Sequence, residues 1–195
     1  VSGFFCLWMA GALVIFNVLE ANRGEENSQV LLQAVQSNMP EIVITEDVPY
    51  EMVQQSVPVS SSKEMLTVSA GNYESIGILS IPALELELPV LTDWSYDKLT
   101  KAPCHYYGSY YESDFVIAAH NYPSHFGRLS QLQYGDLVIF TDVTGEVHRY
   151  QVVLLETLTA TATEEMITSG FDLSLYTCTP GGGSRVTVRC SDVTL

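Results

Sequence analysis

The chain has 195 residues, enough for one domain with appended segments. It carries 23 acidic and 8 basic residues, so its formal charge at pH 7 is −15. That balance excludes a nucleic-acid-binding protein, which needs clustered lysine and arginine, and it argues against attraction to anionic surfaces. We interpret the charge as a source of solubility.

Residues 1–19 contain no charged side chain and are rich in phenylalanine, leucine, valine and isoleucine. This length matches a helix that crosses a hydrocarbon layer of roughly 30 Å. A secretory signal peptide is the alternative, but Leu19-Glu20-Ala21 is a poor cleavage site. A buried core helix would be apolar on fewer sides. We therefore expect a single-pass transmembrane anchor at 1–19, in the cell membrane, with the rest of the chain extracellular.

Residues 20–72 differ from the rest in composition and are rich in serine, glutamine and glutamate. Such a segment buries too little apolar surface to fold alone, so we expect an extracellular stalk. Within it, 25–36 can form a short helix with Val30, Leu31 and Ala34 on one face. Packing of part of this segment on the following domain is the alternative.

Residues 73–195 form the expected folded domain, in which short apolar runs alternate with turns. The expected strands are 75–81, 84–91, 114–120, 136–141, 146–157, 172–178 and 185–191. Short helices or turns are expected at 93–101, 124–132 and 164–170. Thr144-Gly145-Glu146 is typical of a hairpin turn. Many short strands of this kind predict an all-β domain that closes into a barrel.

The stretch that carries chemistry is the pair of runs around a glycine-rich turn, 179–184. Strand alternation puts Cys178 on one face with Ser174 and Tyr176, and antiparallel pairing puts Arg185 near Cys178. Arg189 lies roughly 13 Å further along its strand and is the second choice. A thiol, a guanidinium and an imidazole, supplied by His120 at the end of another apolar run, can attack a peptide carbonyl and stabilise its oxyanion.

These residues resemble the signature of the sortases, cysteine transpeptidases of the Gram-positive cell surface. The family's Thr-Leu-x-Thr-Cys reads Ser174-Leu175-Tyr176-Thr177-Cys178 here, and an arginine-led strand follows at Arg185. The family's catalytic histidine follows an apolar strand, as His120 does after 116–119. The similarity extends over about residues 73–193 and includes the segments 76–82, 88–91, 104–108 and 126–136. Departures are Ser174 for Thr, Ala119 for Gly, and a Cys-to-Arg spacing of only seven residues (185 − 178).

The resemblance implies an eight-stranded sortase barrel in which Cys178 is the nucleophile, His120 the proton donor and acceptor, and Arg185 the oxyanion ligand. The implied substrate is a sorting-signal peptide of the Leu-Pro-x-Thr-Gly kind on a secreted surface protein. The implied acceptor is an amine of a peptidoglycan precursor or a pilin, and no cofactor is implied. Candidate substrate contacts lie beside the site and in the loop before 172–178: Ala119, Thr159, Ala160, Thr161, Ala162, Thr177 and Thr179.

Two other functions remain open at this stage. One is a membrane-tethered cysteine peptidase that passes the acyl group to water, and the other is a non-catalytic surface barrel that binds a partner. Cys104 and Cys190 are either a disulfide or two buried thiols. Carboxylates such as Glu85 and Glu87 share a strand face, but solvation explains them as well as calcium, so no metal ligand is assigned. His148 is expected to be exposed.

Overall fold

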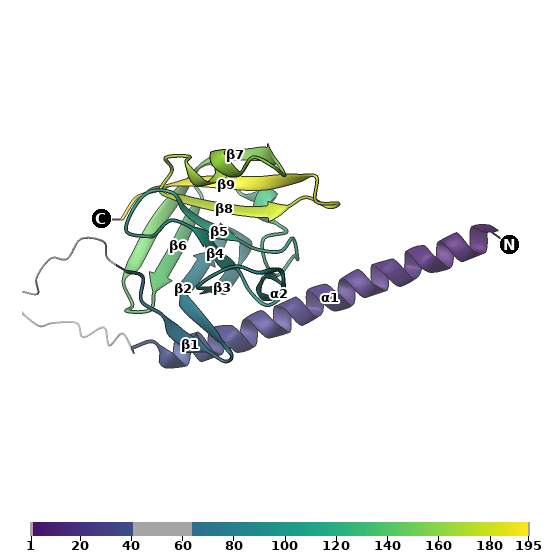
Figure 1. The fold of residues 1–195 in the computed structure, drawn as a ribbon, viewed down its shortest axis with the longest axis horizontal. Coiled ribbons are helices and arrows are strands. Elements are labelled where there is room, and N and C mark those ends of the chain that lie inside the picture. Colours follow the sequence, from purple (N-terminus) through teal and green to yellow (C-terminus); the bar gives the residue numbers. More distant parts are fainter. Residues whose placement is uncertain (1, 41–63, 195) are drawn as a thin grey trace, which may run out of the picture.

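The structure is a computed structural model that describes residues 2–40 and 64–194, and its centre is a β-barrel (Figure 1). The helices are α1 (Ser2–Asn38), α2 (Tyr96–Leu99) and α3 (Thr163–Ile167), with 3-10 turns η1 (Pro82–Leu84) and η2 (Leu129–Gln131). The strands are β1 (Val68–Ala70), β2 (Tyr73–Ile81), β3 (Leu86–Leu91), β4 (Cys104–Tyr107), β5 (Phe115–Ala118), β6 (Leu137–Asp142), β7 (Val147–Thr159), β8 (Leu173–Cys178) and β9 (Ser184–Asp192).

Eight of these strands, β2 to β9, close into a barrel. Their order around it is β2-β3-β4-β5-β8-β9-β7-β6, and pairing of β6 with β2 completes the circle. The predicted eight-stranded, all-β barrel is therefore confirmed. At the closing seam β2 and β6 approach so closely that a Cβ on Gly77 would lie 2.2 Å from the Thr141 carbonyl oxygen. Only glycine fits at that point.

The expected strands are all present, but β1 and β4 were not expected. β1 has three residues in a serine-rich segment and is joined to β2 by a tight turn at Gly71-Asn72. β4 has four residues, Cys-His-Tyr-Tyr, which show no alternation of apolar and polar side chains. Its pairing with β5 is interrupted by a bulge, and it meets β3 at a single residue pair. Tertiary pairing, rather than local sequence, forms both strands.

The barrel interior is filled by alternate residues of the strands. Leu79, Phe115, Phe140, Leu175 and Val188 are each fully buried there. Phe115 and Phe140 meet edge to face, with ring centroids 5.2 Å apart. Because the interior takes every second residue, the side chains between them point outward, where helices and loops cover part of the outer surface.

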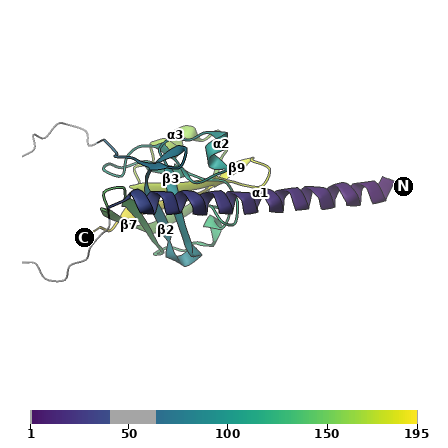
Figure 2. The same ribbon diagram turned by 90° about the horizontal axis from the view of Figure 1, so that it is seen from below.

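Helix α1 is much longer than the helix expected at 25–36, and its second half packs on the outside of the barrel (Figures 1 and 2). Leu31, Leu32 and Val35 are buried against a separate apolar cluster that includes Ile78 and Leu91. Val30 points away and is 67% exposed, so the expected buried face was wrong by about one position. Residues 20–38 of the expected stalk are thus helical and docked, which was the alternative interpretation, while 41–63 lies outside the described residues.

The middle of α1 touches the loop that follows β5. A Cβ added to Gly24 would come within 2.6 Å of the Tyr122 ring, so a side chain at that position would push the two apart. The fully buried His125 places its Nε2 atom 3.3 Å from the Gly24 carbonyl oxygen, to which a neutral imidazole can donate. Gly24 is therefore the point at which the helix meets the loop.

The N-terminal half of α1 extends beyond the barrel, and its large apolar side chains, such as Leu7 and Trp8, are exposed (Figure 1). Within residues 2–40 and 64–194, none of the helices combines the length and the apolar character needed to cross a membrane. The localisation expected from residues 1–19 stays a prediction.

The docking of α1 predicts a loss of stability in acid. Burial lowers the pKa of His125 to about 4, below the value of about 6.5 in an unfolded chain. Between these values the unfolded chain binds the proton more readily, so the stabilisation is complete above pH 6.5 and declines as pH falls toward 4. The free energy of unfolding should fall by about 3 kcal/mol from this group. Urea unfolding at pH 7.5 and 4.5 measures it.

The matched variant for that measurement is His125→Gln, which keeps a donor for the Gly24 carbonyl but does not titrate. Its stability should change less between the two pH values than that of the parent chain. Equal pH dependence in both proteins would contradict the assignment to His125.

Candidate active site

Three neighbouring strands carry or lead to the predicted catalytic residues. β5 runs parallel to β8, and the pairing ends with Ala118 opposite Tyr176. His120 and Cys178 each follow this last pair by two residues. β8 runs antiparallel to β9, with Cys178 directly opposite Arg185, as predicted. Opposite residues project to the same face of a sheet, so Cys178 and Arg185 leave the barrel on one side.

That side is the outer surface of the barrel. Leu173, Leu175 and Val188 point inward into the core, so the alternate residues Ser174, Tyr176 and Cys178 point outward. The connection between β7 and β8, residues 160–172, crosses over this outer face and carries α3. Cys178 is half-buried at the end of β8, where this cover stops.

The backbone just before His120 is fixed by two hydrogen bonds of Ala119. The Ala119 amide donates to the Tyr176 carbonyl (3.2 Å), and the Thr177 hydroxyl donates to the Ala119 carbonyl (2.8 Å). The His120 ring stacks on Tyr122 with centroids 4.7 Å apart and planes within 12°. Burial lowers the pKa of His120, and the Glu20 carboxylate on α1 opposes that shift. Among the described interactions, no hydrogen bond joins the imidazole to the thiol, a common state before substrate binds.

Arg185 is the second residue of β9, and its guanidinium lies against the glycine-rich loop. Its Nη1 donates to the carbonyl oxygens of Gly182 (3.1 Å) and Ser184 (3.2 Å). The loop itself closes by a bond from the Thr179 amide to the Ser184 carbonyl (3.0 Å). That amide is therefore engaged inside the loop and is not directed at an oxyanion.

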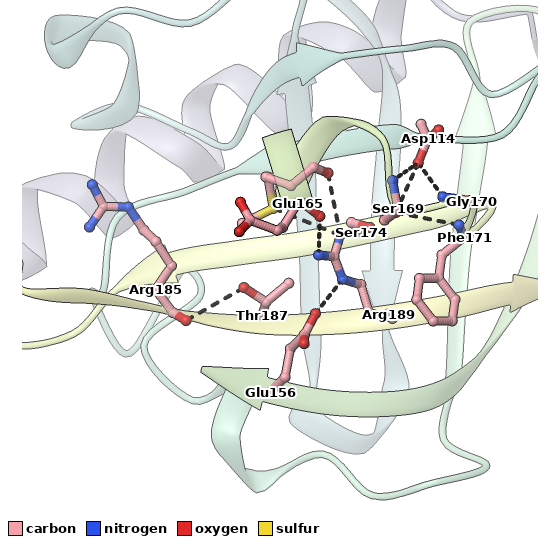
Figure 3. A network of polar contacts seen from close by, with 11 residues as sticks. Asp114, Glu156, Glu165, Ser169, Gly170, Phe171, Ser174, Arg185, Thr187 and Arg189 are labelled. Carbon is pink, nitrogen blue, oxygen red and sulfur yellow. Dashed lines mark hydrogen bonds and ion pairs between the residues drawn. The ribbon is translucent and has the colours of Figure 1, made fainter. Parts of the chain in front are cut away.

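Arg189 has a different environment, which Figure 3 shows beside that of Arg185. Its side chain is 2% exposed and lies between the barrel and α3. It forms an ion pair with Glu156 (2.8 Å), donates to Ser174 Oγ (2.8 Å), and donates to the carbonyl oxygens of Glu165 and Met166. Every one of these partners is structural, which agrees with the ranking of Arg185 ahead of Arg189 as the residue available to a substrate.

A half-buried carboxylate, Asp114, holds the other end of the 160–172 connection. Asp114 Oδ1 accepts from the Ser169 amide (2.7 Å), the Ser169 hydroxyl (2.8 Å) and the Gly170 amide (2.8 Å), as Figure 3 shows. Arg189 and Asp114 together hold the connection against the barrel, so the wall that it forms beside Cys178 has a defined position.

Two hollows meet at Cys178, and they sort the predicted contact residues. The first hollow is lined by Cys178 and Arg185 together with Ala119, Thr159, Ala160 and Ala162. The second hollow is lined by Cys178 with Thr177 and Thr179. Thr161 lines neither of these hollows; its hydroxyl lies 3.3 Å from that of Thr159 instead. His120 also lies outside both linings, and its ring is stacked on Tyr122.

Sequence reasoning missed the aromatic wall of the first hollow, the one lined by Cys178 and Arg185. Trp94, Tyr96, Tyr106 and Tyr176 line it, and neighbouring rings have centroids 5.3 to 5.7 Å apart. Trp94 is 41% and Tyr96 79% exposed, unusual for such large side chains. One signal was available, because Tyr176 shares the outward face of β8 with Cys178.

The remaining cysteines and histidines are structural in this part of the chain. Cys104 and Cys190 are free and buried in two different apolar clusters, which decides against a disulfide between them. Burial raises the pKa of each thiol to about 12, so neither is a nucleophile near neutral pH. His105 has its two ring nitrogens 3.1 and 2.8 Å from the carbonyl oxygens of Thr92 and Gly108.

A family model described as a sortase domain matches residues 79–193, more than half of the chain. The protein belongs to the sortase family. Its resemblance to the sortases in sequence is therefore confirmed, over the segment that contains His120, Cys178 and Arg185. A comparison with curated protein sequences gave no significant match.

Solved sortase structures share the fold. Sortase A from Corynebacterium diphtheriae aligns with a TM-score of 0.57 and 22% identity over 64% of this chain and 63% of that one. Sortase C from Streptococcus pneumoniae aligns with a TM-score of 0.54 and 28% identity, over 62% and 70%. A sortase D5 transpeptidase from Clostridium perfringens gives 0.55 and 19%, over 62% and 79%. The chain thus spans just under two thirds of the corynebacterial enzyme.

The buried position of Arg189 predicts a loss of stability on substitution. Arg189→Met should lower the free energy of unfolding by about 3 kcal/mol, because it leaves Glu156 and the carbonyl oxygens of α3 without their donor. Urea unfolding followed by fluorescence measures the change. Arg149→Met, on the exposed face of β7, is the control and should have little effect. A stable Arg189→Met protein would contradict the structural role.

Proposed function

We propose that this sortase-family chain is a cysteine transpeptidase that cleaves a sorting signal of the Leu-Pro-x-Thr-Gly kind and transfers the acyl part to an amine. The observation that supports the proposal is the strand register: Cys178 lies directly opposite Arg185, and the pairing of β5 with β8 ends two residues before His120 and Cys178. The membership of the family supports the reaction class, and one neighbour, sortase C from Clostridium perfringens, has been solved with a C-terminal cell wall sorting motif.

In the first half of the reaction, the Cys178 thiolate attacks the carbonyl carbon of the scissile peptide bond. Arg185 stabilises the oxyanion, for which its guanidinium turns from the Gly182 and Ser184 carbonyls toward the hollow. The C–N bond then breaks, and the His120 imidazolium gives its proton to the leaving amine. The product is a thioester on Cys178 and a released peptide.

In the second half, an acceptor amine attacks the thioester carbonyl while neutral His120 accepts its proton. The C–S bond breaks, the new amide leaves, and the Cys178 thiolate and the His120 imidazolium are regenerated. The acceptor that we propose is an amine of a peptidoglycan precursor or a pilin. The meeting of two separate hollows at Cys178 favours transfer, because the acyl chain and the incoming amine each have a space beside the sulfur.

The first hollow suits the apolar part of the sorting peptide. Its aromatic wall and the small side chains Ala119, Ala160 and Ala162 leave room for an extended backbone with an apolar side chain. Thr177 and Thr179 are proposed to face the acceptor side. Thr161 is not part of the proposed contacts.

The direct test combines the protein with a Leu-Pro-x-Thr-Gly peptide library, with and without a glycine or lysine amine, and identifies products by mass spectrometry. An amine-dependent ligated product supports transfer, and a hydrolysed peptide alone supports a peptidase. No product, with Cys178 inert to a mild alkylating reagent, would support a non-catalytic binding role.

The oxyanion role predicts a large kinetic loss without a loss of folding. Arg185→Ala should raise the barrier by about 2.7–4 kcal/mol, a fall of about 10² to 10³ in kcat. Its unfolding midpoint should stay near that of the parent, because Arg185 binds only loop carbonyls. Cys178→Ala is the inactive reference. A small effect of Arg185→Ala on kcat would remove Arg185 from the mechanism.

The charge of Glu20 predicts a shift in the pH profile. Its carboxylate raises the pKa of His120, so Glu20→Gln should lower that pKa further. The rate falls as pH rises and His120 loses the proton needed by the leaving amine; in Glu20→Gln this fall should begin at lower pH. The profile of kcat/KM at low salt measures the shift. Glu25→Gln, on the exposed part of the same helix, should leave the profile unchanged; an unchanged Glu20→Gln profile would contradict the coupling.

A further inference from the structure

The β6–β7 hairpin lies at the end of the barrel opposite Cys178. β7 and β8 both pair antiparallel with β9, so they run in the same direction. The start of β7 is therefore at the end where β8 begins, and Cys178 is at the end where β8 finishes. Thr141 pairs with Val147 in the hairpin, and the Asp142 amide donates to the Glu146 carbonyl. This pairing directs Asp142, Glu146 and His148 to one face.

Asp142 is fully buried at the last position of β6, on the inward face of the barrel. Its Oδ1 atom accepts from the Thr144 amide (2.8 Å), the Thr144 hydroxyl (2.7 Å) and the Glu146 amide (3.0 Å). Its Oδ2 atom is also buried and has no hydrogen-bond partner. Half of this carboxylate is thus committed to the turn, and the other half faces the interior unpaired.

His148 is the second buried polar group at this end. The expectation that it is exposed was wrong, because its side chain is only 7% exposed and lies among the rings of Tyr110 and Phe140. Buried and more exposed residues alternate at the start of β7, and His148 falls at a buried position. Its Nε2 atom is buried without a hydrogen-bond partner. Asp142 Oδ2 and His148 Nε2 are therefore both buried without a hydrogen-bond partner, at a considerable energetic cost.

Glu146 completes the group. Its carboxylate is exposed at the tip of the hairpin, and one ligand atom from each of Asp142, Glu146 and His148 lies within 4.8 Å of the other two. A single cation held by one atom from each residue would therefore bind two side chains that carry buried unpaired atoms, while Glu146 stays exposed to solvent. This is the only such group within the described residues.

We propose that Asp142, Glu146 and His148 bind a divalent transition-metal ion, and that zinc fits best. Zinc accepts imidazole nitrogen and carboxylate oxygen at about 2.0–2.2 Å, and three protein ligands with one water complete its tetrahedron. Calcium and magnesium prefer sites built wholly from oxygen, so the imidazole disfavours them. The hydrogen bonds from the turn to Asp142 Oδ1 hold the carboxylate in a fixed orientation for the metal.

The position of the site gives the ion a structural role. The ion would link Asp142, the last residue of β6, to His148, the second residue of β7, at the end of the barrel away from Cys178. Bound metal should therefore raise the unfolding temperature and leave kcat unchanged, because a ligand that binds only the folded chain stabilises it by mass action.

The test uses the full chain without an affinity tag, in a Cys178→Ala background so that zinc cannot bind the catalytic thiol. After removal of metal with a chelator, zinc, manganese and calcium chlorides are titrated separately by calorimetry, and unfolding temperatures are measured with and without each. Zinc should bind at one ion per chain and raise the unfolding temperature. His148→Gln and Glu146→Gln should each weaken zinc binding by about tenfold or more. Glu25→Gln should match the background protein.

Two results would overturn the proposal: no stoichiometric zinc binding, or zinc binding that His148→Gln and Glu146→Gln leave unchanged. Glu146 is exposed, so its variant keeps the test decisive even if His148→Gln fails to fold. Tighter binding of calcium than of zinc would overturn the choice of ion. Crystals grown with zinc should show an anomalous peak beside Asp142 and His148; a density peak there without anomalous signal would mean a bridging water instead.

Discussion

Parallel pairing of β5 with β8 is the constraint on which the candidate site depends. Cys178 and Arg185 belong to one hairpin and meet through a short loop, so their proximity is local. The segment that leads to His120 lies beside the end of β8 because the chain passes from β5 through β6 and β7 and then returns as β8, parallel to β5. Parallel strands always need such a long crossover. The Thr177 hydroxyl bond to the Ala119 carbonyl then fixes the two strand ends together.

The wall beside Cys178, formed by the 160–172 connection, depends on two charged side chains whose role does not require contact with substrate. The connection has one fully buried side chain, that of Met166. Its backbone is instead held by Arg189, through the carbonyls of α3, and by Asp114, through the amides at 169 and 170. Hydrogen bonds and ion pairs suit this task, because their fixed geometry defines the position of a loop more sharply than apolar contacts do.

Sequence reasoning found the barrel and the register of Cys178 with Arg185, because strand alternation and a glycine-rich turn are local patterns. It placed the buried face of α1 wrongly and treated that segment as a stalk, since the apolar cluster it covers comes from strands far along the chain. His148 was misjudged from its charged neighbours. The aromatic wall was missed because Trp94 and Tyr106 converge only after β4 pairs with β5.

Helix α1 gives the domain a handle of defined length and angle. It is continuous from Ser2 to Asn38 and is gripped at Gly24, next to the loop that bears His120. At 1.5 Å per residue, the first turn stands about 33 Å from that grip. A flexible segment would let the hollows beside Cys178 face any direction relative to the N-terminal end of α1, but a continuous helix fixes that direction. One residue inserted before Gly24 would rotate the N-terminal end by about 100° relative to the barrel, so the length of the helix sets the direction in which the hollows face.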